Sequence, residues 1–198
     1  MKKPSEKNWI KSNMKRDRVF IIKTIALNGI IAALYAAITA ACGPLSYEFM
    51  QLRFSELFNL LVFFNPWYTI GLTLGCLMAN MFSSVGPIDI VFGTLTTLVA
   101  CLIMIVYSKF IKNLFSTGII PCILNAIVVP LTIYVSTINT ADPMVLTPSL
   151  YFMMFGWVFL GEFVCIICVG YPIFLLLTKK NQRFYPLILA TRNTNYKW

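Results

Sequence analysis

One carboxylate stands inside a long apolar run. Glu162 lies in FGWVFLGEFVCIICVGYP and is the ionisable residue placed deepest in an apolar stretch. A charge in hydrocarbon is costly, so such a residue is by default a candidate for function. Helical spacing puts Phe159, Phe155 and Tyr151 on the same face. The pattern predicts a carboxylate below a line of aromatic rings, a pocket that suits a flat polar ring. A structural hydrogen bond to another helix is the alternative.

A second polar side chain interrupts the apolar run PCILNAIVVP. This is Asn125, which follows Pro121 by four positions and precedes Pro130 by five. Prolines inside a helix free backbone carbonyls from helical bonding, so an amide beside them favours a binding wall. A hydrogen bond that joins two helices remains the other interpretation.

The segment YEFMQLRFSE, residues 47–56, places charges among aromatic residues. Arg53 and Glu56 stand three apart and pair if this stretch is helical, whereas Glu48 lies earlier in the segment. We interpret the segment as a structured external loop that closes over a ligand, the alternative being an ordinary charged loop. Asp89 follows Gly86 and Pro87, and we expect its side chain to cap the helix that begins there.

Small residues recur every four positions near the N-terminus. Such spacing repeats a small residue on one helical face, which lets another helix approach closely in lipid. The pattern therefore predicts either a docking face for a partner protein or close packing within the chain. The residues concerned are Gly29, Ala32, Ala33, Ala36, Ala37, Ala40 and Ala41.

Composition favours a chain embedded in a membrane. Of its 198 residues, 59% are hydrophobic and only 12% are charged, far from the usual balance of soluble domains. The net charge of +9 is concentrated near both ends, which indicates membrane lipid rather than nucleic acid as the partner. Histidine is absent, and so is a phosphate-cradling GxxxxGK[ST] loop, so we expect no enzyme, cofactor or metal in this chain.

The apolar segments predict an all-α integral membrane protein. They run over about 19–42, 57–82, 88–110, 114–138 and 149–178. Asn65 and Pro66 interrupt the second segment, which predicts two short helices and six transmembrane helices in total. Six crossings place both basic tails, 1–18 and 179–198, in the cytoplasm, as the positive-inside rule favours. Residues 19–178 then form one transmembrane substrate-binding domain of a prokaryotic plasma membrane.

Several short segments together resemble one family. GPLSYEFMQLRFSE (43–56), GPIDIVFGTLTTL (86–98), the dipeptide at 125–126, and GE followed by VGYP (161–162 and 169–172) are similar to the queuosine-precursor transporter (QueT) family. Its members are substrate-binding S components of energy-coupling factor (ECF) transporters of the ABC type. The resemblance implies docking through the small residues of the first helix onto a T component with two ATPase subunits. It also implies toppling of the whole S component in the membrane.

For the ligand, the resemblance implies a 7-deazaguanine such as 7-aminomethyl-7-deazaguanine, or queuine. A carboxylate accepts two parallel hydrogen bonds from a guanine-type edge, which is the role we expect for Glu162. Asn125 or Arg53 would read the ring carbonyl. The other expected contacts are an ammonium at Asp89, Glu48 or Glu56 and stacking on Tyr151, Phe155 or Phe159.

Two other functions fit the same residues. An S component for another flat vitamin, such as riboflavin or a folate-like ring, would use the same aromatic side chains. A membrane enzyme or assembly factor would use Glu162 as an acid or base, although no histidine or paired carboxylate supports it.

Overall fold

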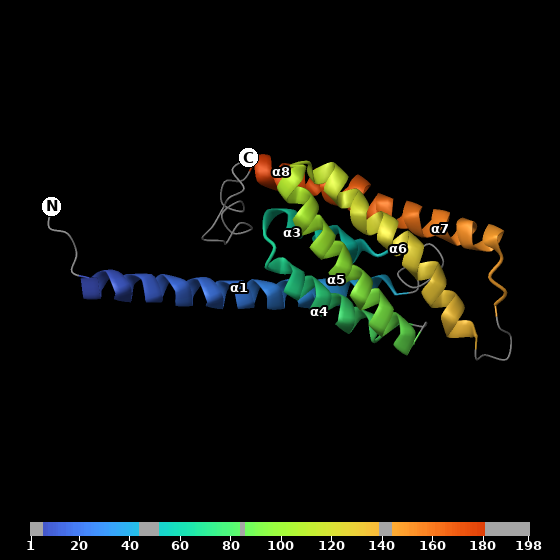
Figure 1. Ribbon diagram of the computed structural model, residues 1–198, viewed down its shortest axis with the longest axis horizontal. Helices are drawn as coiled ribbons and strands as arrows, with labels where there is room; N and C mark the ends of the chain where they lie inside the picture. Colours follow the sequence, from blue (N-terminus) through green and yellow to red (C-terminus); the bar gives the residue numbers. More distant parts are fainter. Residues whose placement is uncertain (1–5, 44–51, 84–85, 139–143, 181–198) are drawn as a thin grey trace.

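The computed structural model describes residues 6–43, 52–83, 86–138 and 144–180, and every regular element in this part is a helix (Figure 1). Long helices lie side by side around a short central one. In chain order the elements are α1 (Glu6–Cys42), η1 (Phe54–Leu60), α3 (Leu61–Phe64), α4 (Tyr68–Asn80), α5 (Pro87–Phe110), α6 (Leu114–Thr137), α7 (Pro148–Phe163), η2 (Val164–Gly170) and α8 (Tyr171–Lys180).

Four helical stretches are long and apolar enough to cross a membrane: Arg18–Cys42, Pro87–Phe110, Leu114–Thr137 and Pro148–Thr178. They coincide with four of the five predicted apolar segments. The last stretch joins α7, η2 and α8 into one continuous run. Their large apolar side chains cover much of the outer surface, as expected where the surrounding solvent is lipid.

The predicted interruption of the remaining segment is confirmed. The 3-10 helix η1 and the short α3 end at Asn65, whose backbone is extended with φ −150° and ψ 111°. Proline disfavours helical geometry in the residue before it, so Pro66 accounts for this end. The start differs from the prediction, because the helix begins at Phe54 rather than near residue 57. Arg53 and Glu56 therefore belong to a helical segment and its first turn rather than to an external loop.

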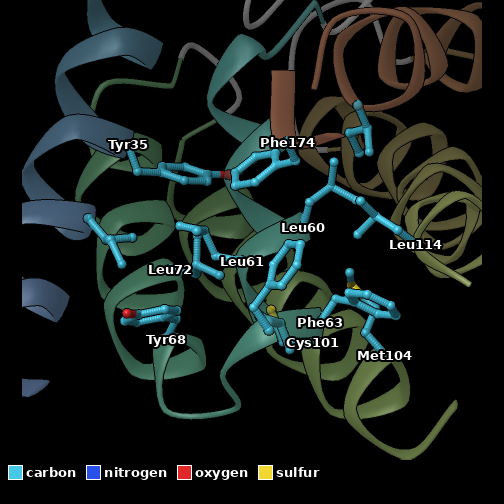
Figure 2. Close-up of a cluster of buried hydrophobic side chains, with 14 of the residues drawn as sticks. Tyr35, Leu60, Leu61, Phe63, Tyr68, Leu72, Cys101, Met104, Leu114 and Phe174 are labelled. Atoms are coloured by element: carbon cyan, nitrogen blue, oxygen red, sulfur yellow. The ribbon is translucent and has the colours of Figure 1, made fainter. Parts of the chain in front are cut away.

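The short central segment is the core of the bundle. Residues 60–64 are all apolar and all buried, as expected of a helix that is hydrophobic on every side. The segment contacts α1, α4, α5, α6, η2 and α8. Figure 2 shows Leu60, Leu61 and Phe63 amid side chains from these neighbours. Because the core surrounds η1, the polar residues at its beginning are also inside the protein.

Two glycines bring α4 against α1. A Cβ at Gly75 would lie 2.7 Å from the Cβ of Tyr35, so this contact requires glycine. One turn earlier, the backbone N–H of Gly71 donates to Oδ1 of Asn28 over 2.6 Å. Amides in the first turn of a helix lack partners within the helix. Asn28 of α1 therefore supplies a hydrogen-bond acceptor for a backbone amide near the beginning of α4.

Candidate functional site

Glu162 and Asn125 meet inside the bundle. Glu162 lies in the last turn of α7 and Asn125 in the middle of α6, and Nδ2 of Asn125 donates to Oε1 of Glu162 over 2.9 Å. Glu162 is only 1% exposed. Its second oxygen, Oε2, has no hydrogen-bond partner among the described residues. One oxygen is thus fixed and the other is a free buried acceptor, which is unusual because buried polar atoms are nearly always paired.

The helix changes its winding directly after Glu162. Residues 164–170 form the π-helix η2, in which 165, 166 and 167 are all buried. Gly170 allows this turn to approach η1, since a Cβ there would lie 2.9 Å from Leu57. Short π-helical turns are rare and frequently occur at functional sites. The sequence analysis did not predict this feature.

The aromatic side chains on α7 form a ladder. Phe155 and Phe159 stack with ring centroids 6.3 Å apart and an angle of 4° between their planes, and Phe159 stacks on Phe163 at 6.0 Å. Phe163 was not among the predicted site residues, although it continues the same four-residue spacing. Tyr151 has a different role, because its hydroxyl donates to the backbone oxygen of Ile127 over 3.1 Å and so ties α7 to α6.

Arg53 and Asp89 form a buried ion pair. Their side chains approach to 3.2 Å and are 5% and 3% exposed. This pair bears on two expectations. Arg53 forms an ion pair with Asp89, which lies 36 positions away, a partner that local spacing did not indicate. Asp89 directs a carboxylate oxygen at this guanidinium, while Gly86 is the N-cap residue of α5 and provides no side-chain cap.

Glu56 is a second buried acid, so Glu162 is not the only ionisable residue inside the bundle. Glu56 is 1% exposed. It accepts hydrogen bonds from the hydroxyl of Tyr35 and from Nδ2 of Asn59. Beside them, the hydroxyls of Thr39 and Ser55 lie 2.6 Å apart and join α1 to η1. Tyr35 and Asn59 were missed, although the three-residue spacing of Glu56 and Asn59 could have indicated their contact.

The interior of the described part is rich in acceptors. It contains the carboxylates of Glu56 and Glu162, each only 1% exposed. Asp89 already neutralises Arg53. Oδ1 of Asn59 also has no hydrogen-bond partner in the described residues. Such an interior favours a molecule that presents several N–H donors.

Two further predictions concern Glu48 and metal ions. Glu48 falls within 44–51 and so lies outside the described residues. No group of three His, Cys, Asp or Glu side chains in the described part is arranged to hold a metal ion.

The structure separates the small residues of α1 into two faces. Ala32 is buried, and its backbone lies against Gly75 of α4. Ala36 is half-buried. The exposed members are Gly29, Ala33, Ala37, Ala40 and Ala41. One face therefore packs within the protein, and the other is free in the part of the chain that the structure describes.

An all-helical bundle with lipid-facing apolar sides and unpaired acceptors inside defines a multi-pass membrane protein with an internal polar site. Residues 25–179 match the family described as QueT transporter. The chain belongs to this family, which confirms the resemblance seen in the sequence.

A curated relative supports the assignment. The chain is 38% identical over 108 residues to the protein named Queuosine precursor transporter QueT of Lactococcus lactis subsp. cremoris (strain MG1363). The match covers 53% of this chain and 62% of the relative. No solved structure matches the chain.

Proposed function

We propose that this protein is the substrate-binding S component of an ECF transporter and takes up a queuosine precursor. The ligand is a 7-deazaguanine such as 7-aminomethyl-7-deazaguanine, or queuine. Membership of the QueT transporter family and the name of the relative support the transport role and the substrate class. The observation on which the recognition mode depends is the free Oε2 of Glu162 beside the fixed Oε1.

In this proposal Glu162 reads the guanine-type edge. Asn125 holds one carboxylate oxygen, so the carboxylate keeps its orientation before the ligand arrives. The ring N–H and the exocyclic amino group of the base then donate two parallel hydrogen bonds, the arrangement in which a carboxylate binds most strongly. The faces of Phe155 and Phe159 provide stacking surface, worth about 1–3 kcal/mol per base in aromatic contacts elsewhere.

Asn59 supplies a further acceptor, and Glu56 holds Asn59 in place. Both carboxylate oxygens of Glu56 already accept hydrogen bonds within the protein, from Tyr35 and Asn59. We therefore assign Glu56, Arg53 and Asp89 to the framework of the site. Glu48 remains the acid proposed to meet the aminomethyl cation.

The exposed small residues of α1 are proposed to bind the T component. Ala33, Ala37 and Ala41 recur every four residues and are all exposed, so a partner helix can approach the backbone closely. The chain has no GxxxxGK[ST] loop, so in this proposal two partner ATPase subunits supply the energy. Toppling of the S component on the T component then carries the ligand inward.

Calorimetry on the purified protein tests the recognition mode. Glu162→Gln replaces the charged acceptor by an amide and should weaken binding of 7-aminomethyl-7-deazaguanine by about 10- to 100-fold, the difference expected for a hydrogen bond to a charged group. Riboflavin, which lacks this donor edge, should not bind.

Glu56→Gln is the matched control, because it makes the same change in the other buried glutamate. We expect it to lower the melting temperature of the ligand-free protein more than Glu162→Gln does. Unchanged affinity in Glu162→Gln would remove this residue from the base edge. Tight binding of riboflavin would contradict the proposed substrate class.

A further inference from the structure

A groove runs between α1 and α4 on the outer side of the bundle. Its volume is about 450 Å³, and it lies near the beginning of α4, where α1 extends past the rest of the bundle (Figure 1). Its lining includes large apolar side chains from both helices, among them Ile21, Ile25, Trp67, Ile70 and Leu74. In a membrane such a groove is filled by hydrocarbon, because an empty one would lose the dispersion contacts of its walls.

One buried polar atom beside this groove is unpaired. Thr24 lines the groove and is 8% exposed, and its hydroxyl has no hydrogen-bond partner among the described residues. The neighbouring Asn28 is satisfied, because its amide donates to the backbone oxygen of Thr24 and accepts from Gly71. A buried hydroxyl without a partner is unfavourable. Threonine adopts two χ1 rotamers in helices, and rotation would turn the hydroxyl toward the groove. An occupant that brings an acceptor to Thr24 would then bind better than plain hydrocarbon.

A positive charge precedes the groove along α1. Arg18 is exposed. It precedes Ile21, Ile25 and Gly29 by three, seven and eleven positions, so it lies on the face of α1 that lines the groove. Trp67 stands at the beginning of α4 and is half exposed, and tryptophan is enriched at the headgroup level of membranes.

We propose that this groove binds an anionic glycerophospholipid. Along α1 the order is a cation at Arg18, a hydroxyl at Thr24 and then hydrocarbon-lined walls. A glycerophospholipid presents its phosphate, ester carbonyl and acyl chain in the same order. The phosphate pairs with Arg18, an ester carbonyl accepts from the Thr24 hydroxyl, and an acyl chain lies against Ile25, Ile70 and Leu74. Basic sites between membrane helices bind acidic lipids by the same chemistry.

Trp67 provides a probe inside the groove. A variant with Trp9, Trp157 and Trp198 changed to phenylalanine keeps Trp67 alone, and a second variant keeps only Trp157, which is exposed on α7. Both are reconstituted in bilayers that contain phosphatidylglycerol or phosphatidylcholine with brominated acyl chains, which quench nearby tryptophan. We expect brominated phosphatidylglycerol to be preferred severalfold at Trp67, whereas Trp157 should show no preference.

Single substitutions in the Trp67 variant identify the contacts. Arg18→Gln should reduce the preference for phosphatidylglycerol by about fivefold, the contribution of one basic residue at an anionic surface. Lys23→Gln is the matched control, because Lys23 is also exposed but lies outside the groove lining, and it should change the preference little. Thr24→Val should weaken the binding of both lipids.

The opposite results would overturn the proposal. Equal quenching of Trp67 by the two lipids would exclude a headgroup-specific site. Equal effects of Arg18→Gln and Lys23→Gln would show a general surface charge effect instead. Weak quenching of Trp67 by both lipids would show that protein, rather than lipid, covers the groove. None of these measurements depends on the transported substrate.

Discussion

At the scale of single residues, the buried ion pair of Arg53 and Asp89 joins the beginning of η1 to the first turn of α5. Both side chains are almost completely buried, so each depends on the other for charge compensation. Removing one partner of a buried pair leaves an uncompensated charge, which costs far more than removing both.

Arg53→Met should therefore destabilise the protein by about 3–5 kcal/mol. The double variant Arg53→Met/Asp89→Leu should recover much of this loss, because no charge is left unpaired. Thermal unfolding of the detergent-purified variants measures both effects. If the losses of stability in Arg53→Met alone and in Asp89→Leu alone simply add in the double variant, the pair does not stabilise the fold as a unit.

Spacing in the sequence identified Glu162, Asn125, Arg53, Asp89 and Glu56 as residues worth naming, but it did not identify their partners. Asn125 and Glu162 are 37 positions apart, and Tyr35 and Glu56 are 21 apart. Pairs that distant depend on how the helices pack, which local patterns do not encode. Local spacing suggested Glu56 as a partner of Arg53, but it gave no sign of the ion pair with Asp89.

At the scale of elements, α1 has an inner face that packs on α4 and an outer face of exposed small residues. We expect substitutions on the inner face to lower stability and substitutions on the outer face to prevent assembly with a partner. Gly156 on α7 is a suitable control for both, because a Cβ there would meet no atom within 4 Å.

Gly75→Ala tests the inner face. The added methyl group would lie 2.7 Å from the Cβ of Tyr35, so we expect a loss of about 1–3 kcal/mol, as is typical of overpacking. Gly156→Ala should be neutral or slightly stabilising, because alanine favours a helix over glycine. Denaturation of the two variants in detergent compares them directly. Equal stability would mean that α1 and α4 are not held at this distance.

Ala37→Leu tests the outer face. The larger side chain would keep a partner helix from approaching α1, so co-purification with the T component and ATPase subunits should be lost. Binding of 7-aminomethyl-7-deazaguanine to the isolated variant should remain, because this face is remote from the buried acceptors. Gly156→Leu should assemble normally. Assembly of Ala37→Leu at the normal yield would contradict docking through this face.

Most element boundaries could be predicted, because apolar length and Pro66 determine them locally. The beginning of η1 could not. Arg53, Ser55 and Glu56 give that stretch the composition of an exposed loop, yet all three are buried. Their polar groups find partners on α1 and α5, and such long-range partners override the local preference. The π-helical turn after Glu162 was not predicted either, and it too packs against a segment distant in sequence, η1.

At the scale of the whole molecule, the order of the helices predicts which connections share a side of the membrane. With six crossings, the turn between α5 and α6 at residues 111–113 faces the cytoplasm, together with both termini. The segment before α7 faces outward. Exposed Lys109 and Lys112 beside the α5–α6 turn agree with this orientation.

Cysteine labelling measures the orientation. In a background without the six native cysteines, Asn113→Cys should react with a membrane-impermeant maleimide only in inside-out vesicles. Val145→Cys, in the segment before α7, should react in intact cells. Both native residues are exposed, so access should not limit the reaction. Labelling of both positions from the same side would exclude the six-helix topology.

The short helix α4 also affects the membrane around it. It comprises 13 residues and rises about 20 Å, less than the ~30 Å of a hydrocarbon layer, and its Ile70, Leu74 and Met78 are exposed. A bilayer that adapts to so short a lipid-facing helix is compressed locally, and this compression stores elastic energy. Tilting would shorten the span of α4 further, so the rotation proposed for transport should respond to lipid chain length.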